Sequence, residues 1–228
     1  MTASRIIIWR HGRTDWNIVN RFQGQADIAL DALGHAQAKQ AAPALAAYQP
    51  VALYSSDLSR AWQTAEALAE LTGLEVRLDR RLREIHVGSW EGLLGEEIDA
   101  ANPELARRLH AGEDVRRSPT GESPSEVAER MVSALREMAE RIPDHSTVVV
   151  VTHGLAGRVG ACRFVGLPQE QWRVLGGLAN CAWVTIERHR SAGYWRIAEY
   201  NVALAHDELE SNDSRLPPND FVSPVGPR

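Results

Sequence analysis

The stretch Ile6–Thr14, with the sequence IIIWRHGRT, is an apolar run that ends abruptly in a basic residue, a histidine and a glycine. It predicts a buried strand over residues 5–9 that delivers Arg10 and His11 to one edge of a sheet. Gly12 allows the chain to turn tightly there and to approach a ligand closely. Ligands of open α/β sheets bind at this carboxyl edge of the strands. We therefore expect a functional site around His11.

A second stretch, Val148–Gly154 (VVVVTHG), ends in the same way and predicts a strand over residues 147–152. If the two strands run parallel, His153 emerges at the same edge as His11. A helix is expected to follow Gly154, and the amides of a helix N-terminus bind anions well.

A third stretch, Ser55–Arg60 (SSDLSR), joins the end of an expected strand to the start of an expected helix. It places Arg60 in the first helical turn, at the same edge of the sheet as Arg10 and the two histidines. This combination predicts a pocket for a dianion, of which a phosphoryl group is the commonest in biology. A neutral imidazole beside a guanidinium that holds the phosphorus is suited to nucleophilic attack, and the surrounding positive charges favour the neutral form of His11.

The remaining pattern alternates strands and helices. The expected strands cover residues 5–9, 51–55, 75–78, 147–152, 180–187 and 194–200, and the expected helices cover residues 33–48, 57–72, 123–142 and 154–164. Gly73 is expected to cap the end of the second helix, and Ser123–Glu126 (SPSE) predicts a capping box with proline at the first position of the third. This order predicts an α/β fold, a three-layer sandwich with a mainly parallel central sheet and helices on both faces.

The chain of 228 residues fits one domain over residues 1–205, followed by a polar, proline-rich tail over residues 206–228 that packs weakly or not at all. Residues 13–32 read as a polar loop with a turn at residues 23–25. Residues 84–145 form the one long insertion, a lid or specificity region that is irregular over 84–122 apart from a helical piece near 103–111.

The composition excludes several classes of function. A net charge of −5 and the lack of a long basic run argue against nucleic-acid binding. Neither Cys162 nor Cys181 lies in a CxxC pair, which disfavours a zinc or redox motif. No segment approaches the roughly 20 apolar residues of a membrane span, and no signal peptide is seen. We expect a cytoplasmic protein. We expect no metal either, because Arg10 and Arg60 would repel a cation.

Four motifs occur in a specific order: Arg10–Gly12 (RHG), Ser56–Ala61 (SDLSRA), Arg83–Glu84 with Gly88–Gly92 (RE and GSWEG), and Thr152–Gly154 (THG). Together they resemble the histidine phosphatase superfamily, in the branch that contains the cofactor-dependent phosphoglycerate mutases and their phosphatase relatives. The resemblance covers about residues 5–200. Within this branch the chain looks most like the glucosyl-3-phosphoglycerate phosphatases, on the stretches Arg10–Asn17, Gln23–Gln25, Ser55–Leu58 and Gly176–Asn180.

The resemblance implies a role for each matching residue. His11 is the nucleophile that becomes phosphorylated, Arg10, Arg60 and His153 hold the phosphoryl oxygens, and Glu84 protonates the leaving alcohol. The residues expected to contact the substrate are Asn17, Gln23, Gly24, Gly154, Leu155 and His86. No cofactor is implied.

Two of these interpretations have structural alternatives, and one further pair of residues has two possible roles. Glu84 could simply pair with Arg81 or Arg83. His86 could pack the insertion instead of lining the substrate entrance. Arg116 and Arg117 either read a substrate carboxylate or belong to a solvated loop.

The expected activity is hydrolysis of a small phosphorylated metabolite through a phosphohistidine, with glucosyl-3-phosphoglycerate as a candidate. The alternative is phosphoryl transfer of the phosphoglycerate mutase type, and Arg116–Ser118 is similar to a mutase substrate motif. Mutases, however, hold the substrate with a lysine shortly after the Arg-Glu segment, whereas Lys39 is the only lysine here. A phosphate sensor is a third alternative, although every site residue is retained. The expected partner is a small metabolite, not nucleic acid or a membrane, and the strands over 180–200 could pair in a homodimer.

Overall fold

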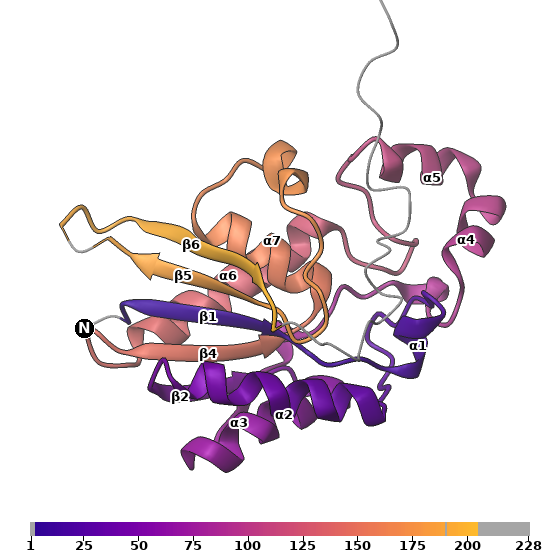
Figure 1. Ribbon diagram of the computed structural model, residues 1–228. Coiled ribbons are helices and arrows are strands. Elements are labelled where there is room, and N and C mark those ends of the chain that lie inside the picture. The colour runs from indigo at the N-terminus through magenta and orange to yellow at the C-terminus, as the bar shows by residue number, and fades with distance from the viewer. Residues whose placement is uncertain (1–2, 190, 205–228) are drawn as a thin grey trace, which may run out of the picture.

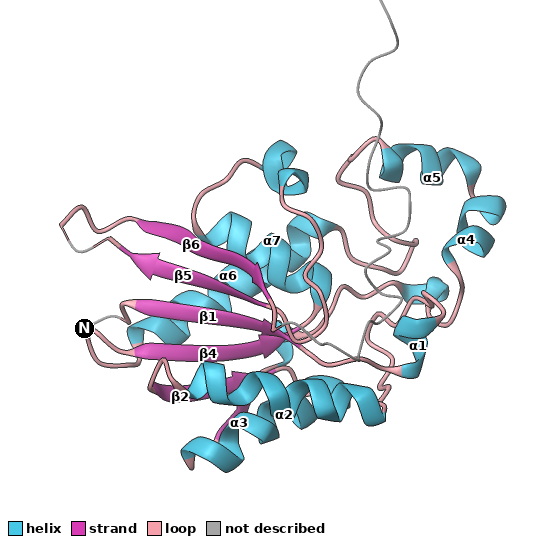
Figure 2. Cartoon of the chain, in the orientation of Figure 1, coloured by secondary structure: helices cyan, strands magenta, loops and turns pink. Residues whose placement is uncertain are grey.

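The computed structural model describes residues 3–189 and 191–204 (Figures 1 and 2), so the predicted tail over 206–228 lies outside the described residues. In the described residues the strands form one sheet with the order β3-β2-β4-β1-β5-β6. The strands are β1 (Arg5–Arg10), β2 (Pro50–Ser55), β3 (Val76–Leu78), β4 (Thr147–Thr152), β5 (Trp183–Arg188) and β6 (Trp195–Val202). The strands β1, β2, β3 and β4 form the parallel part of the sheet, and β5 and β6 extend it with antiparallel pairs.

Helices cover both faces of this sheet, which confirms the predicted α/β sandwich (Figure 2). One face packs against α2 (Ala32–Ala46) and α3 (Ser59–Thr72), and the other against α6 (Pro124–Glu140) and α7 (Gly154–Phe164). Ile6 and Ile8 point to the α6–α7 side, whereas Ile7 and Trp9 point to the α2–α3 side. Successive residues of a strand face opposite sides of a sheet, so a strand buried on both faces needs an unbroken apolar run.

The strand register brings three chain segments to one edge of the sheet. Arg10 pairs with Thr152 across β1 and β4, and Ser55 pairs with Val151 across β2 and β4. The next backbone amides continue these ladders: the amide of His11 donates to the Thr152 carbonyl at 3.0 Å, and that of Ser56 to the Val151 carbonyl at 2.9 Å. The residues that follow each strand therefore start from one line of backbone hydrogen bonds.

The helix ends follow their sequence signals. The Ser123 hydroxyl accepts from the amide of Glu126, and the Glu126 carboxylate accepts from the amide of Ser123. This capping box starts α6, whose first residue is Pro124. Gly73 ends α3 with φ at 70°, the left-handed conformation that favours glycine. Both features confirm the sequence prediction.

The segment over 84–122 is more helical than predicted. It contains α5 (Pro103–His110), where a helical piece was expected, and also α4 (Gly95–Ala101), which was not. α4 has two turns between Gly95 and Pro103, too short for a clear apolar period. Short elements explain the other differences, which are α1 (Asp15–Ile18) in the predicted loop and the 3₁₀ turns η1 (Arg80–Leu82), η2 (Gly88–Trp90) and η3 (Gln169–Val174).

The predicted strand over 180–187 begins later, at Trp183, because residues 180–181 form a turn in which Cys181 takes a positive φ of 55°, outside the extended region. In the described residues no helix is long and apolar enough to cross a lipid bilayer.

The loop after β1 packs backbone against backbone on the start of α2. A Cβ atom built on Gly12 would lie 2.4 Å from the Gly34 carbonyl oxygen, and one on Gly34 would lie 2.1 Å from the Arg13 carbonyl oxygen. Neither contact can be relieved by a side-chain rotation, since both partners are main chain. This contact fixes the path of the chain that carries His11.

We expect Gly34→Ala to lower the free energy of unfolding by about 2 kcal/mol or more, because the new methyl group forces two backbone segments apart. Gly176→Ala is the matched control, since nothing lies within 4 Å of its added Cβ atom. Urea unfolding of the two variants measures the difference. Equal stability of both variants would contradict the close contact.

Candidate active site

His11 is buried at the carboxyl end of β1 and is held in one tautomer. Its Nδ1 lies 2.6 Å from the carbonyl oxygen of Gly12, which can only accept, so Nδ1 carries the proton and Nε2 keeps its lone pair. The side-chain amide of Asn180 and the backbone amide of Cys181 donate to the His11 carbonyl at 3.1 and 3.2 Å. The Thr64 hydroxyl accepts from the Gly12 amide at 3.0 Å. These contacts fix both ring and backbone.

The surroundings of His11 keep it uncharged. Burial, followed by the charges of Arg60 and Arg10, holds the pKa of His11 well below its usual value. A low pKa leaves Nε2 unprotonated at neutral and mildly acidic pH. The imidazole therefore has the electronic form that a nucleophile needs.

His153, just after β4, lies against His11. The two ring centroids are 5.2 Å apart and the rings are inclined at 62°. Arg60 donates from Nε to His153 Nδ1 at 3.2 Å, and since a guanidinium cannot accept, the ring proton lies on Nε2, which donates to the Ser56 hydroxyl at 2.9 Å. Burial and the charge of Arg60 hold the pKa of His153 well below its usual value.

Arg60 is almost completely buried, with 1% of its surface exposed. Its two terminal nitrogens donate to the carbonyls of Ala26 and Gly24 at 2.7 and 2.8 Å. Burial lowers the pKa of Arg60 to about 10, so it remains charged at neutral pH. Gly24 supports this contact from a tight turn with φ at 50°, where a Cβ atom would lie 2.6 Å from Val87.

Arg10, the last residue of β1, completes the cluster. Its Nη1 donates to the Leu178 carbonyl at 2.5 Å. A Cβ atom on Gly154 would lie 3.4 Å from Arg10 Nε, so the glycine that starts α7 leaves room beside the guanidinium. The structure thus brings Arg10, His11, Arg60 and His153 to one place, as the strand ends predict.

Glu84 lies between η1 and η2, at the N-terminus of α7. Its Oε1 accepts from the amides of Ile85 and Ala156 at 2.9 and 3.0 Å, and its Oε2 accepts from the amide of Leu155 at 3.1 Å. The Leu155 amide is thus directed to Glu84 and not to an open anion site, which differs from the expectation that this helix end faces the phosphoryl group. Binding of substrate by Gly154 and Leu155 stays a prediction.

The alternative pairing of Glu84 with its arginine neighbours does not occur. Arg83 forms a bidentate pair with Asp57, with both distances at 2.6 Å, and Arg81 binds Asp79 and Glu137. Both guanidiniums are therefore directed away from the Glu84 carboxylate.

One residue that holds this segment in place could not be predicted from the sequence. Arg130 of α6 donates to the carbonyls of Arg81, Arg83 and Glu84 at 2.8, 2.6 and 2.9 Å. It also binds both carboxylate oxygens of Glu122 at 2.8 and 2.9 Å. Arg130 lies in no motif, and a helical arginine gives no sequence signal for such a role. Ser56 lies inside a motif, but its contact with His153 was also missed.

The other predicted substrate residues make structural contacts. Asn17 Oδ1 accepts from the amide and hydroxyl of Thr14, both at 3.0 Å, and so caps α1. Gln23 Nε2 donates to the Thr14 hydroxyl at 2.8 Å, while its buried Oε1 has no hydrogen-bond partner in the described residues. His86 is half-buried, with Nδ1 3.0 Å from the Thr120 carbonyl oxygen. Their contacts with substrate stay predictions.

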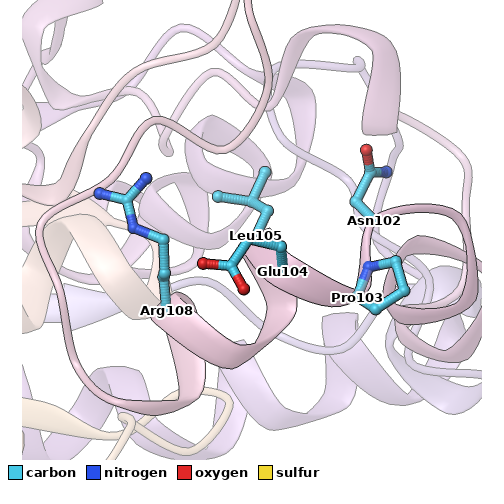
Figure 3. Close-up of a pocket in the computed structure, with 5 residues that line it drawn as sticks. All are labelled: Asn102, Pro103, Glu104, Leu105 and Arg108. Carbon is cyan, nitrogen blue, oxygen red and sulfur yellow. The ribbon is translucent and has the colours of Figure 1, made fainter.

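Arg116 is exposed and binds the carboxylate of Glu126 and the Gly121 carbonyl. A pocket on the insertion (Figure 3) is lined by Asn102 and by residues of α5 between Pro103 and Arg108, and no residue of the strand-edge cluster lines it. In the part of the chain that the structure describes, no group of three His, Cys, Asp or Glu side chains could hold a metal ion.

Known proteins share this arrangement of elements. A model of the histidine phosphatase superfamily (branch 1) matches residues 6–203. The chain belongs to the histidine phosphatase superfamily. This confirms the resemblance that the four motifs carry.

Several members of the superfamily align along most of the chain. It is 38% identical to a glucosyl-3-phosphoglycerate phosphatase from Mycolicibacterium vanbaalenii, over 92% of this chain and 100% of that one. A solved structure of the mycobacterial glucosyl-3-phosphoglycerate phosphatase with VO3 matches at a TM-score of 0.82 and 38% identity, over 88% of this chain and 100% of that one. A probable phosphoglycerate mutase from Erwinia tasmaniensis is 34% identical, over 93% of this chain and 97% of that one. The superfamily and its phosphatase members make this chain a phosphomonoester hydrolase that acts on a small phosphorylated metabolite.

The two buried imidazoles make stability depend on pH. An unfolded histidine takes up a proton near pH 6.5, whereas folded His11 and His153 do so only at lower pH. Below pH 6.5 the unfolded chain therefore binds more protons than the folded chain, and stability falls as the pH falls.

We expect His153→Gln to reduce this loss of stability between pH 6.5 and 5, by an amount that approaches about 1.4 kcal/mol per pH unit. His35→Gln, at an exposed position of α2, is the control. Urea unfolding at pH 7.5, 6 and 5 gives the slopes. A slope for His153→Gln that equals that of the wild type would show that His153 is not kept neutral.

Proposed function

We propose that the chain hydrolyses phosphomonoesters through a phosphohistidine formed on His11 Nε2. One observation carries the proposal: the bond from His11 Nδ1 to the Gly12 carbonyl leaves the Nε2 lone pair available, beside two guanidiniums and a second neutral imidazole. An unprotonated nucleophile next to fixed positive charge is what phosphoryl transfer requires, because its transition state spreads negative charge over the phosphoryl oxygens.

In the first step, Nε2 of His11 forms a bond to phosphorus while the bond from phosphorus to the substrate's ester oxygen breaks. Arg10 and Arg60 stabilise the charge on the phosphoryl oxygens, and we assign the Nε2–H group of His153, which contacts the Ser56 hydroxyl, as a further donor to one of these oxygens. The leaving alkoxide takes a proton, and we assign Glu84 as its donor. A positioned acid of this kind contributes typically 10²–10⁴-fold to the rate.

The hydrogen bonds of Glu84 favour one of its oxygens for this task. Oε1 accepts two backbone hydrogen bonds and Oε2 accepts one, so Oε2 keeps a lone pair for a proton. In the second step the Glu84 carboxylate takes a proton from water as that water attacks phosphorus. The bond from phosphorus to Nε2 breaks, inorganic phosphate leaves, and His11 and the protonated Glu84 are restored.

We propose glucosyl-3-phosphoglycerate as the substrate. The support is the name that the mycobacterial relatives carry and their alignment with nearly the whole of this chain. A cytoplasmic location, where such metabolites occur, and the absence of a nucleic-acid partner belong to the same proposal. Pairing in a homodimer would use β6, which forms one edge of the sheet.

A mutase-type reaction is supported by the 34% identity to a probable phosphoglycerate mutase. A mutase must return the phosphoryl group to its substrate, whereas a phosphatase gives it to water. Incubation with 3-phosphoglycerate distinguishes them: we expect inorganic phosphate and no 2-phosphoglycerate.

The first test is replacement of the nucleophile. We expect the wild type to release phosphate from an aryl phosphate at mildly acidic pH and His11→Ala to lower the rate by at least about 10³-fold. A single turnover quenched in alkali should trap an acid-labile phosphohistidine in the wild type only. Release that survives in His11→Ala would refute the proposed intermediate.

The second test separates the acid from the nucleophile. We expect Glu84→Gln to lower kcat/KM for an alkyl phosphate by about 10²-fold or more, and kcat/KM for an activated aryl phosphate much less, because an aryl oxide leaves without a proton. The two kcat/KM values are compared, since kcat/KM reports the first step and not the attack of water, in which Glu84 also takes part. Glu91→Gln is the control, because the Glu91 carboxylate accepts from the amide of Gln25 and has no assigned part in the reaction. Equal losses on both esters would exclude Glu84 as the proton donor.

A further inference from the structure

A second cavity lies beside the strand edge, between α5 and the connection to α6, α7 and η3. Its volume is about 330 Å³, and Arg117, Arg158 and Arg173 are among the residues that line it. This volume is within the range of small-molecule sites. Figure 1 shows that α5 and the turn after α7 lie on the same side of the sheet. The cavity is distinct from the pocket on α5 in Figure 3.

Arg158 is the unusual member of this lining. Its Nε is buried and has no hydrogen-bond partner in the described residues, and its Nη1 reaches the Leu175 carbonyl only at 3.5 Å. By contrast Arg163, on the same helix, pairs with Glu129 at 2.7 Å. Arg158 as a whole is half-buried and lines the cavity, and in the described residues the protein gives its guanidinium only the one long hydrogen bond to Leu175. A charged donor with so little compensation favours a ligand that the chain itself does not supply.

The neighbours of Arg158 do not neutralise it. Cys162 and Tyr200 both feel its charge, but burial raises the pKa of the Cys162 thiol to about 11 and raises that of Tyr200 above its usual value, so both are uncharged at neutral pH. Of the two carboxylates that line the cavity, Glu113 is paired with Arg108 at 2.7 Å and Glu170 is exposed. The lining thus keeps an excess of positive charge.

A short segment connects this cavity to the phosphoryl site. Leu175 accepts from Arg158, and Leu178 accepts from Arg10. Three residues of chain span at most about 11 Å, so the two guanidiniums lie within roughly 17 Å of each other. The path along α7 is also short, because Arg158 lies only about 6 Å of helical rise beyond Gly154, the first residue of the helix. This separation is short enough for one extended phosphorylated metabolite to span.

We propose that Arg158 binds a carboxylate on the part of the substrate beyond the phosphoryl group, with the cavity as its subsite. The inference rests on the proposed function, because it takes the phosphoryl group to lie at His11. A carboxylate fits better than a neutral hydroxyl, since it compensates the buried charge and accepts hydrogen bonds from two nitrogens of a guanidinium. Arg158 is then a specificity residue that selects acidic phosphomonoesters over neutral ones.

The test compares two matched pairs of substrates. In each pair one member carries a carboxylate and the other a hydroxymethyl group: glucosyl-3-phosphoglycerate with glucosylglycerol 3-phosphate, and 3-phosphoglycerate with glycerol 3-phosphate. For the acid member of at least one pair, Arg158→Met should lower kcat/KM by about 10- to 100-fold, mainly through KM. For the neutral member the change should stay within about 2-fold. Arg158→Lys should recover part of the loss.

Two controls keep the outcome interpretable. Arg163→Met removes an arginine from the same helix outside the cavity and should change neither pair. Hydrolysis of an aryl phosphate by Arg158→Met shows that the variant is folded and that its phosphoryl site is intact.

The proposal is overturned if Arg158→Met leaves all four substrates unchanged, or if it lowers both members of each pair equally. Failure of the proposed function looks different. It appears as aryl phosphate hydrolysis that does not depend on His11, whatever the residue at position 158.

Discussion

Arg60 carries a full positive charge that the fold withdraws from water without giving it a carboxylate in hydrogen-bond contact. In the described residues its hydrogen bonds go to two carbonyls and to one neutral imidazole. Neutral acceptors satisfy the geometry of a guanidinium, and the carboxylates that act on its charge, of which Glu84 contributes most, lie beyond hydrogen-bond contact. An oxyanion that enters the site recovers this electrostatic cost, so the free protein is already arranged for a phosphoryl group.

The same buried charge helps to set the state of both histidines. Burial of the rings holds the pKa of each histidine low, and the charge of Arg60 lowers both pKa values further, so neither ring takes up a second proton. The parallel register of β1, β2 and β4 makes this possible, because it starts three loops from one row of backbone hydrogen bonds. The sheet supplies position, and the burial of the two rings beside the charge of Arg60 supplies the protonation states.

Much of this arrangement could be predicted from the sequence. The unbroken apolar runs before Arg10-His11 and Thr152-His153 indicate strands buried on both faces, and such strands occur in parallel sheets whose carboxyl ends meet. That reasoning places four side chains at one edge without any knowledge of their contacts. The capping signal at Ser123 likewise locates the start of α6 correctly.

Contacts made across the chain could not be predicted in this way. Arg130 reaches the carbonyls of residues 81–84 from a helix almost 50 positions away, and nothing in its own neighbourhood distinguishes it from a surface arginine. The amides at the start of α7 were expected to face a bound anion. Those of Leu155 and Ala156 instead donate to the Glu84 carboxylate, which the loop at the start of the insertion places at this helix end. Short helices such as α4 escape detection for a simpler reason: two turns carry too few apolar positions to define a period.

The position of Arg130 on α6 has a consequence for how this enzyme can diversify. The hydrogen bonds of Arg130 join the Glu84 segment to a helix whose inner face is packed in the core, not to α4 or α5. Drift in the outer helices can therefore reshape what enters the site while the carboxylate at the end of α7 keeps its place. A fold of this kind can acquire a new substrate specificity through changes in α4 and α5, while the reacting groups keep their positions.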